Sequence, residues 1–242
     1  AATMVTSGIY LIARLSGAVY VDATWVLHVI GIVGALTALL AALIAVAQND
    51  IKKVLAYSTV SQLGFMFMAL GAGAFSTAIF HVMTHAFFKA CLFLGSGSVI
   101  HAMEHMHTVD DPQDVRTMGG LRKYMPSTGT TFWISTLAIA GIPGLAGFFS
   151  KDEIMAKNFA AGMSGEAVYY LVWGVGMFTA FLTAFYMTRI TYLTFNGEER
   201  FPQEKKPHES SSLMTIPLWV LAALAVVWGY IGLPEVIGHG HY

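Results

Sequence analysis

Residues 24–48 form a run of 25 residues that contains no Asp, Glu, Lys or Arg. A helix that crosses the hydrocarbon core of a bilayer needs about 20 mostly apolar residues, and this run exceeds that length. Only 11% of the 242 residues are charged, whereas soluble domains carry roughly 25%. The run and the composition together predict a membrane protein. The formal net charge of −1 offers no basic surface for nucleic acid.

Other apolar segments repeat this pattern along the chain, and together they predict an all-α, polytopic transmembrane bundle of about seven spans. The first expected span is short, because the chain begins inside an apolar segment with neither an initiator methionine nor a basic leader. We therefore expect a piece of a longer protein. The expected spans are residues 3–16, 24–48, 54–72, 77–102, 128–151, 166–195 and 215–233.

The fifth expected span is interrupted by Gly141-Ile142-Pro143-Gly144. Gly and Pro are tolerated within a span when neighbouring helices satisfy the freed backbone groups. Transporters use such discontinuous helices to build ion sites near the middle of the membrane. The sequence therefore predicts one broken helix with a functional role, and the alternatives are a simple kink or an ordinary turn between two helices.

The loops between these spans differ in charge. Counting loops alternately, one side collects all the loop lysines and arginines, and the opposite loops hold none. By the positive-inside rule the basic loops are expected in the cytoplasm. The basic residues are Lys52, Lys53, Arg116, Arg122, Lys123, Arg200, Lys205 and Lys206.

The fourth expected span carries His81, His85 and Lys89 at intervals of four residues. Four residues of α-helix rise about 6 Å and turn by about 40°, so the three side chains form a slanted ladder on one face. A lysine at this depth is costly unless it faces protein or water. Because burial disfavours its charged form and a carboxylate favours it, Lys89 would respond to surrounding charges. With histidines that titrate near neutrality, the pattern predicts a hydrated proton relay.

Two other interpretations of this ladder stay open. A histidine inside a membrane helix is often a hydrogen-bonded packing residue. The His81-x-x-x-His85 spacing also suits a metal ion, although no carboxylate or third histidine stands nearby in the sequence and a cationic Lys89 would oppose binding.

Two further charged clusters have uncertain depth. Lys151, Asp152 and Glu153 follow the interrupted span. They are either solvated at a helix end, or Lys151 is held inside the protein with Asp152 or Glu153 as its partner. Asp50 and Lys52 are open to the same two interpretations, as a membrane-surface flank or as a charge pair within the bundle.

Four segments of the chain are QNDIKKVLAYSTVSQLGFMF, HVMTHAFFKACLFLGSGSVIH, MGGLRKYMP and GIPGLAGFFSKDEI. They resemble the antiporter-like subunit L family of respiratory complex I and occur in the order of that family. Within the last segment, FFSKDEI resembles subunit L more than its sisters M and N. The wider family includes the large subunit of multisubunit sodium/proton antiporters, which shares the lysine ladder.

The resemblance implies a fold of fourteen core helices with two inverted five-helix repeats, each containing a broken helix. Residues 24–195 would be the second repeat, 1–23 the end of a truncated transmembrane helix, and 196–242 a cytoplasmic linker, the final span and a tail. By match to the motifs, the proton relay would comprise the central Lys89 with His81 and His85 beside it, the broken-helix Lys151 with the adjacent Asp152, and Asp50 and Lys52 at the junction with the first repeat.

The resemblance also implies a function. The chain would be a proton-translocating subunit of a bacterial NADH:quinone oxidoreductase in the inner membrane, without redox chemistry or a cofactor of its own. FMN, iron–sulfur clusters and quinone would belong to partner subunits, and a neighbouring antiporter-like subunit would be its closest partner in the membrane arm. The alternatives are a sodium/proton antiporter subunit, a metal-handling membrane protein and a purely structural membrane subunit.

Overall fold

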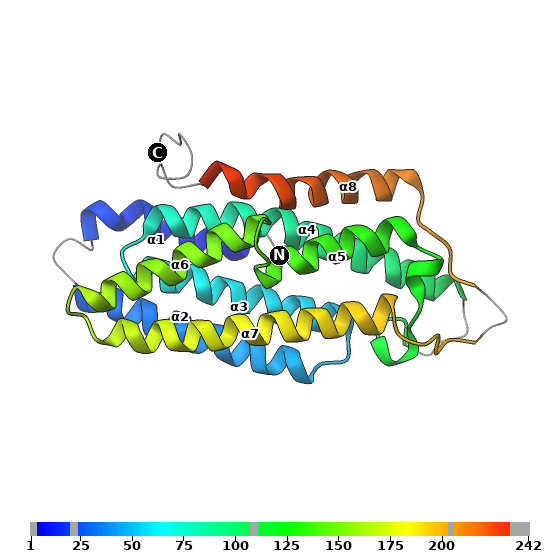
Figure 1. Cartoon of the computed structure of the whole chain (residues 1–242), viewed down its shortest axis with the longest axis horizontal. Helices are drawn as coiled ribbons and strands as arrows, with labels where there is room; N and C mark the ends of the chain where they lie inside the picture. Colours follow the sequence, from blue (N-terminus) through cyan, green and yellow to red (C-terminus); the bar gives the residue numbers. More distant parts are fainter. Residues whose placement is uncertain (1–3, 20–23, 107–110, 203–205, 233–242) are drawn as a thin grey trace.

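Long helices lying side by side make up the protein (Figure 1). The computed structural model describes residues 4–19, 24–106, 111–202 and 206–232. In these ranges the backbone is helical apart from turns, loops and one isolated bridge between Asp50 and Asp114. The α-helices are α1 (Ser7–Val19), α2 (Thr24–Ala47), α3 (Ile51–Gly71), α4 (Phe75–Met106), α5 (Pro126–Ala140), α6 (Ala146–Met163), α7 (Val168–Phe195) and α8 (Ser212–Val227). Short 3₁₀ helices are η1 (Met4–Thr6), η2 (Val115–Thr117), η3 (Leu121–Lys123) and η4 (Trp228–Gly232).

The all-α membrane fold predicted from the sequence is confirmed. In the described ranges, five helices are long and apolar enough to cross a membrane: Trp25–Ala47, Ile51–Gly71, Phe75–Met106, Val168–Phe195 and Ser212–Gly232. A shorter apolar helix covers Met4–Ser16, and the fifth expected span is divided between α5 and α6. Thr3 and Leu233, at the ends of two expected spans, and the basic residue Lys205 lie outside the described residues.

The break between α5 and α6 falls where the sequence predicts it. Gly141 ends α5 with a φ of +84°, and Gly144 has a φ of +90°. Residues other than glycine rarely adopt such positive φ values. Pro143 lies between them and cannot donate a backbone hydrogen bond. Gly147, in the first turn of α6, then lies against the carbonyl of Ala138 with no room for a side chain. The two half-helices are therefore held against each other near the middle of the bundle (Figure 1).

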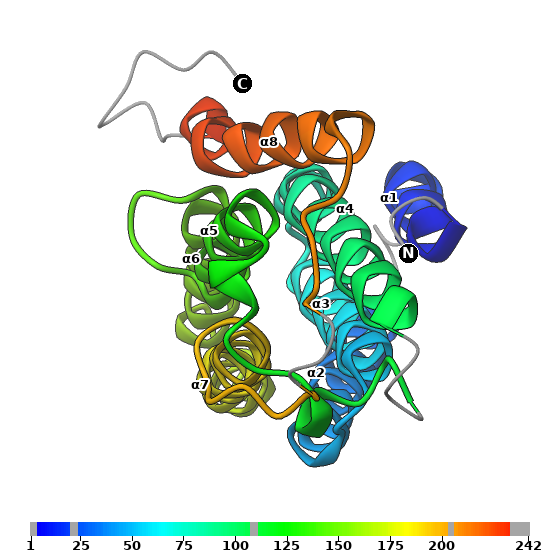
Figure 2. The same ribbon diagram turned by 90° about the vertical axis from the view of Figure 1, so that its right-hand side faces the viewer.

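Helix α4 lies at the centre of the packing. It contacts α1, α3, α5, α6 and α8, and the end-on view shows α8 and α1 on its outer sides and α3 below it (Figure 2). Groups on its buried face therefore meet several helices at once.

Helices α2 and α3 approach each other through small residues. A Cβ added at Gly64 would lie 2.6 Å from the Cβ and backbone N of Ala38 and 2.6 Å from the Gly34 carbonyl oxygen. The Ser61 hydroxyl donates a hydrogen bond of 3.0 Å to the Ala38 carbonyl at the same contact. Membrane helices commonly associate in this way, because small residues let the backbones come close.

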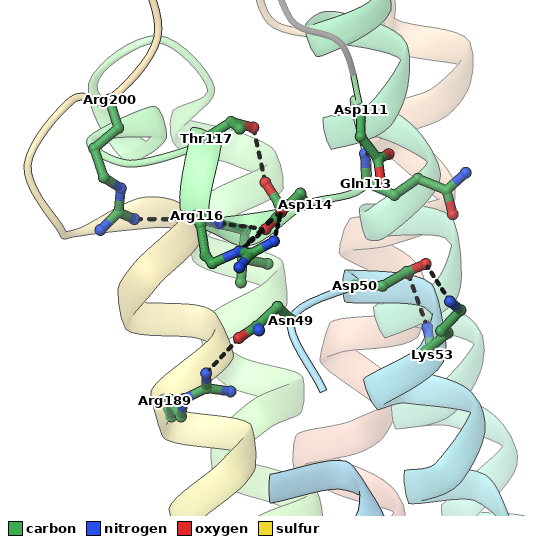
Figure 3. A network of polar contacts seen from close by, with 11 residues as sticks. Asn49, Asp50, Lys53, Asp111, Gln113, Asp114, Arg116, Thr117, Arg189 and Arg200 are labelled. Carbon is green, nitrogen blue, oxygen red and sulfur yellow. Dashed lines mark hydrogen bonds and ion pairs between the residues drawn. The ribbon is translucent and has the colours of Figure 1, made fainter. Parts of the chain in front are cut away.

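The turn between α2 and α3 is tied to the loop between α4 and α5 (Figure 3). The Ile51 amide donates to the Gln113 carbonyl at 3.0 Å, and the Val115 amide donates to the Asn49 carbonyl at 2.9 Å. Arg189 of α7 adds a third segment, donating to the Asn49 side chain at 2.8 Å. The basic loops thus meet at one end of the bundle.

Asp114 fixes the start of η2 within this loop (Figure 3). Its carboxylate accepts hydrogen bonds from the amide and the guanidinium of Arg116, the shortest at 2.6 Å. These hydrogen bonds from Arg116 hold the pKa of the Asp114 carboxyl below its ordinary value.

The linker carboxylate Glu209 caps the start of α5, accepting from the Ser127 amide at 2.7 Å and the Thr128 hydroxyl at 2.6 Å. We expect Glu209→Ala to speed hydrogen exchange at Ser127 and Thr128 by roughly fivefold, because a lost N-cap costs about 1 kcal/mol. The control is Glu198→Ala, which removes an exposed carboxylate elsewhere in the linker. Unchanged exchange in Glu209→Ala would show that the cap is not needed.

Candidate functional site

His81, His85 and Lys89 lie on one face of α4 and are fully buried. The His81 and His85 ring centroids are 6.3 Å apart. The slanted ladder that the four-residue spacing predicts is therefore present, and it points into the bundle rather than toward its surface.

His81 joins three helices. Its Nδ1 lies 2.8 Å from the Ser150 hydroxyl of α6, and its Nε2 lies 3.2 Å from Oε1 of Gln62 on α3. The Thr84 hydroxyl is also 2.9 Å from the Ser150 hydroxyl. Because Gln62 Oε1 only accepts, Nε2 carries a hydrogen in this arrangement, and Nδ1 faces a hydroxyl that can donate or accept. The ring can thus exchange a proton with Ser150.

Lys89 is held by a backbone carbonyl. Its Nζ donates to the Leu55 carbonyl oxygen of α3 at 2.9 Å and lies 5.7 Å from the centroid of the Phe93 ring. The Thr59 hydroxyl donates to the same carbonyl at 3.0 Å. An ammonium group has three hydrogens to donate, so this single hydrogen bond leaves Lys89 able to bind a further acceptor.

His85 lies between these two groups, and its ring contacts those of His81 and Phe88. Neither of its ring nitrogens hydrogen-bonds within the described ranges, and the same holds for the Gln62 amide nitrogen and the Ser58 hydroxyl. Buried polar groups without a protein partner are ordinarily satisfied by ordered water. The chemistry of this stretch therefore suits water between Lys89 and His81.

Lys151 comes from the broken helix and is also buried. Its Nζ donates to the Ile139 carbonyl oxygen at 2.7 Å and lies 5.2 Å from the centroid of the Phe65 ring. The last carbonyls of a helix have no partner within that helix, so the interruption after α5 provides the acceptor for this lysine. The sequence left two positions possible for Lys151, a solvated helix end or the protein interior, and in the structure it lies in the interior.

The neighbouring carboxylates do not pair with Lys151. The Asp152 side chain is exposed, and Glu153 instead accepts a hydrogen bond of 2.7 Å from the Thr77 hydroxyl of α4. In the described ranges, no ion pair includes Lys151.

Asp50 and Lys52 lie at the basic end of the bundle. Asp50 caps α3 by accepting from the Lys53 amide at 3.0 Å, and its carboxylate lies 4.0 Å from Lys53 Nζ. Lys52 is exposed. Within the ranges described, no hydrogen bond or ion pair joins either residue to the buried histidines and lysines of α4 and α6.

Four buried bases thus lie in the bundle, and the charge on one affects the others. They are His81, His85, Lys89 and Lys151. Lys151 interacts electrostatically with each of the other three, and Lys89 interacts with His85. Among the described residues no Asp or Glu is buried. A proton gained by one base is thus felt as repulsion by the others.

Sequence reasoning did not find Tyr186, a large side chain that is fully buried on α7. Its hydroxyl lies close to those of Ser58, Ser61 and Thr183, without a hydrogen bond of normal geometry. A tyrosine in an apolar span carries no recognisable signal of its own. Ser58, Ser61 and Gln62 of α3 are also fully buried.

Within the described residues, the fold brings no further metal ligand to His81 and His85. Both ring nitrogens of His81 already face hydrogen-bond partners. In the described part of the chain, no group of three or more His, Cys, Asp or Glu residues could hold a metal ion.

Comparison with known proteins places this arrangement in context. Residues 1–183 match the family model described as NADH:quinone oxidoreductase/Mrp antiporter, transmembrane. The chain is 50% identical over 256 residues to NAD(P)H-quinone oxidoreductase chain 5 of Picosynechococcus sp., covering 97% of this chain and 37% of that protein. It is 42% identical over 255 residues to NADH-quinone oxidoreductase subunit L of Neisseria meningitidis, covering 98% of this chain and 36% of that protein. The chain thus spans well under half the length of these relatives.

Two solved structures share the fold. The Mrp complex from Dietzia sp. superposes with a TM-score of 0.77 at 21% identity, over 92% of this chain and 47% of that one. The membrane-bound sulfane sulfur reductase, an archaeal respiratory membrane complex, superposes with a TM-score of 0.79 at 26% identity, over 93% of this chain and 37% of that one.

Proposed function

We propose that this chain, which belongs to the NADH:quinone oxidoreductase/Mrp antiporter transmembrane family, moves protons across a membrane as part of an NADH:quinone oxidoreductase. The observation that carries the proposal is the set of four buried bases, His81, His85, Lys89 and Lys151, in a bundle of membrane-spanning helices. Ionisable groups are costly inside a membrane and ordinarily mark ion pathways or proton relays.

In this proposal a proton passes between Lys89 and Lys151 through the two histidines. Water would connect Lys89, His85 and His81, and the contact of His81 with Ser150 would continue the path to α6, where Lys151 is the next residue. Asp152, Asp50 and Lys52 stay in the proposal only as residues at the two ends of the path. Residues 24–195 would form one functional repeat, with 1–23 and 196–242 flanking it.

Electrostatic coupling would drive this movement. Moving one charge against 100 mV costs about 2.3 kcal/mol. Two unit charges 7 Å apart interact by roughly 2.4 kcal/mol at an effective dielectric constant near 20. A charge change in a neighbouring subunit can therefore supply an energy of the required size.

The relatives' names and the membrane fold support the remaining parts of the proposal. Flavin, iron–sulfur clusters and quinone would be bound by partner subunits of the oxidoreductase. The partner in the membrane would be another antiporter-like subunit of the membrane arm. The chain would lie in a bacterial inner membrane with its basic loops in the cytoplasm, following the charge asymmetry of the loops.

The proposal is tested with the complete complex reconstituted in sealed vesicles. We expect NADH oxidation by quinone to drive proton transport, and a quinone-site inhibitor to stop both together. Transport that responds only to sodium or proton gradients, with no dependence on NADH, would instead identify a sodium/proton antiporter. The sodium arm of the experiment omits NADH and varies only the sodium gradient.

A further inference from the structure

A cavity of about 510 Å³ lies beside the proton relay, between α1, the first turns of α4, α6 and η4. Its walls are largely apolar, and Glu153 is the one carboxylate among the described residues that line it. The start of α4, which contributes Phe75, Ser76 and Thr77 to the wall, lies at the end of the bundle opposite the basic loops (Figure 1). Arg14 of α1 lines the same cavity, but within the described ranges no ion pair joins it to Glu153. A half-buried carboxylate in a largely apolar wall is unfavourable without polar partners.

Glu153 is directly joined to the helix that carries the ladder. Its carboxylate accepts a hydrogen bond of 2.7 Å from Thr77, and Thr77 stands four residues before His81 on α4. On α6, Glu153 stands three residues after Ser150, which contacts His81 at 2.8 Å. One turn of each helix therefore separates the Thr77–Glu153 pair from the His81–Ser150 pair.

The charges around Glu153 are unequal. Tyr10 and Arg14 of α1 line the cavity together with Glu153. His81 stands four residues after Thr77 on α4, and Lys151, Asp152 and Lys157 stand within four residues of Glu153 on α6. Cationic and basic groups are thus the majority of the titratable side chains on the elements around this carboxylate. A carboxylate at a cavity wall is a group that can bind and release a proton.

We propose that Glu153 is the group through which the buried relay exchanges protons with water at the end of the bundle opposite the basic loops. Thr77 is the positioning residue that aims the carboxylate. The inference rests on the proposed function and adds a specific exit or entry point to it. The competing explanation is that the Thr77–Glu153 hydrogen bond only pins α4 to α6.

The first test asks whether water reaches the cavity. In the complete complex in sealed vesicles, Ser76→Cys places a thiol on the cavity wall next to Thr77. We expect a membrane-impermeant maleimide to label it from the side opposite the basic loops, above the background of the wild-type complex. No labelling from either side would mean a dry cavity and would overturn the proposal.

The second test separates proton exchange from packing. Glu153→Gln keeps an acceptor for Thr77 but cannot carry a proton, and we expect transport per NADH oxidised to fall by about tenfold, the change in rate that a modest rise in the barrier produces. Thr77→Val removes the hydrogen bond but keeps the carboxylate, so it should reduce transport less and leave its pH profile unchanged. If both variants behave alike, the pair is a structural pin and the proposal is wrong.

Two controls keep this result apart from the proposed function. Glu198→Gln removes an exposed carboxylate outside the cavity and should transport protons like the wild type. Lys89→Ala tests the relay itself. If Lys89→Ala stops transport while Glu153→Gln does not, the relay stands and only the role of Glu153 fails. If neither changes transport, the proposed function fails.

Discussion

Replacing Lys89 with alanine is expected to lower proton transport by the complete complex by roughly tenfold or more, equivalent to a barrier higher by about 1.4 kcal/mol or more. The variant leaves His85, which has no protein hydrogen bond of its own in the described ranges, facing an apolar gap next to the Leu55 carbonyl. A proton has no group to occupy in that gap. The measurement is vesicle acidification per NADH oxidised, with assembly checked by native electrophoresis.

Two further substitutions at Lys89 show which property matters. Lys89→Arg keeps the positive charge but cannot release a proton, so we expect it to transport as poorly as the alanine variant. Lys89→His keeps a titratable group and should retain part of the activity. Lys206→Ala removes an exposed lysine between α7 and α8 and serves as the control. Normal transport by an assembled Lys89→Ala complex would remove Lys89 from the relay.

The second large effect is expected at the contact between α2 and α3. Gly64→Val would place its Cβ 2.6 Å from the Ala38 backbone nitrogen and the Gly34 carbonyl oxygen, and helix backbone atoms cannot move aside locally. Overpacking a close contact costs about 1–3 kcal/mol or more. We expect the assembled complex to fall to a small fraction of the wild-type amount in the membrane, and the remainder to have a lower midpoint of thermal denaturation.

A matched control exists on α7. Gly174 is exposed, and a Cβ added there meets nothing within 4 Å. Gly174→Val makes the same change of residue type within a helix, so it should assemble normally. Equal amounts of the Gly64→Val and Gly174→Val complexes would show that α2 and α3 can separate without harm.

The features that the sequence predicts well are those contained in a single helix. The spacing of His81, His85 and Lys89 fixes their common face, because helix geometry alone relates residues four apart. Gly141, Pro143 and Gly144 predict the break for an equally local reason, since their backbone preferences interrupt a helix. The apolar runs likewise predict where helices lie, to within a few residues.

The features that the sequence does not predict are contacts between helices. No local pattern tells that Lys89 reaches the Leu55 carbonyl, or that Lys151 reaches Ile139. Both acceptors are backbone groups, which every residue carries, so their identity depends on how the helices are rotated and packed. For the same reason the sequence left open whether Lys151 is paired with an acid, and it gave no sign of the Thr77–Glu153 hydrogen bond.

Among the described residues, three of the four buried bases, His81, Lys89 and Lys151, contact carbonyl or hydroxyl oxygens rather than carboxylates. Such dipoles stabilise a cation without cancelling it, so each proton that enters raises the net charge of the interior. A proton on Lys151 and a proton on Lys89 then repel each other. In the proposed relay, the number of bound protons would therefore limit itself, because an entering proton would repel the one already bound, as ions do in a multi-site channel. The bundle would then hold few protons at a time, and binding of a proton at one end would promote release of a proton at the other.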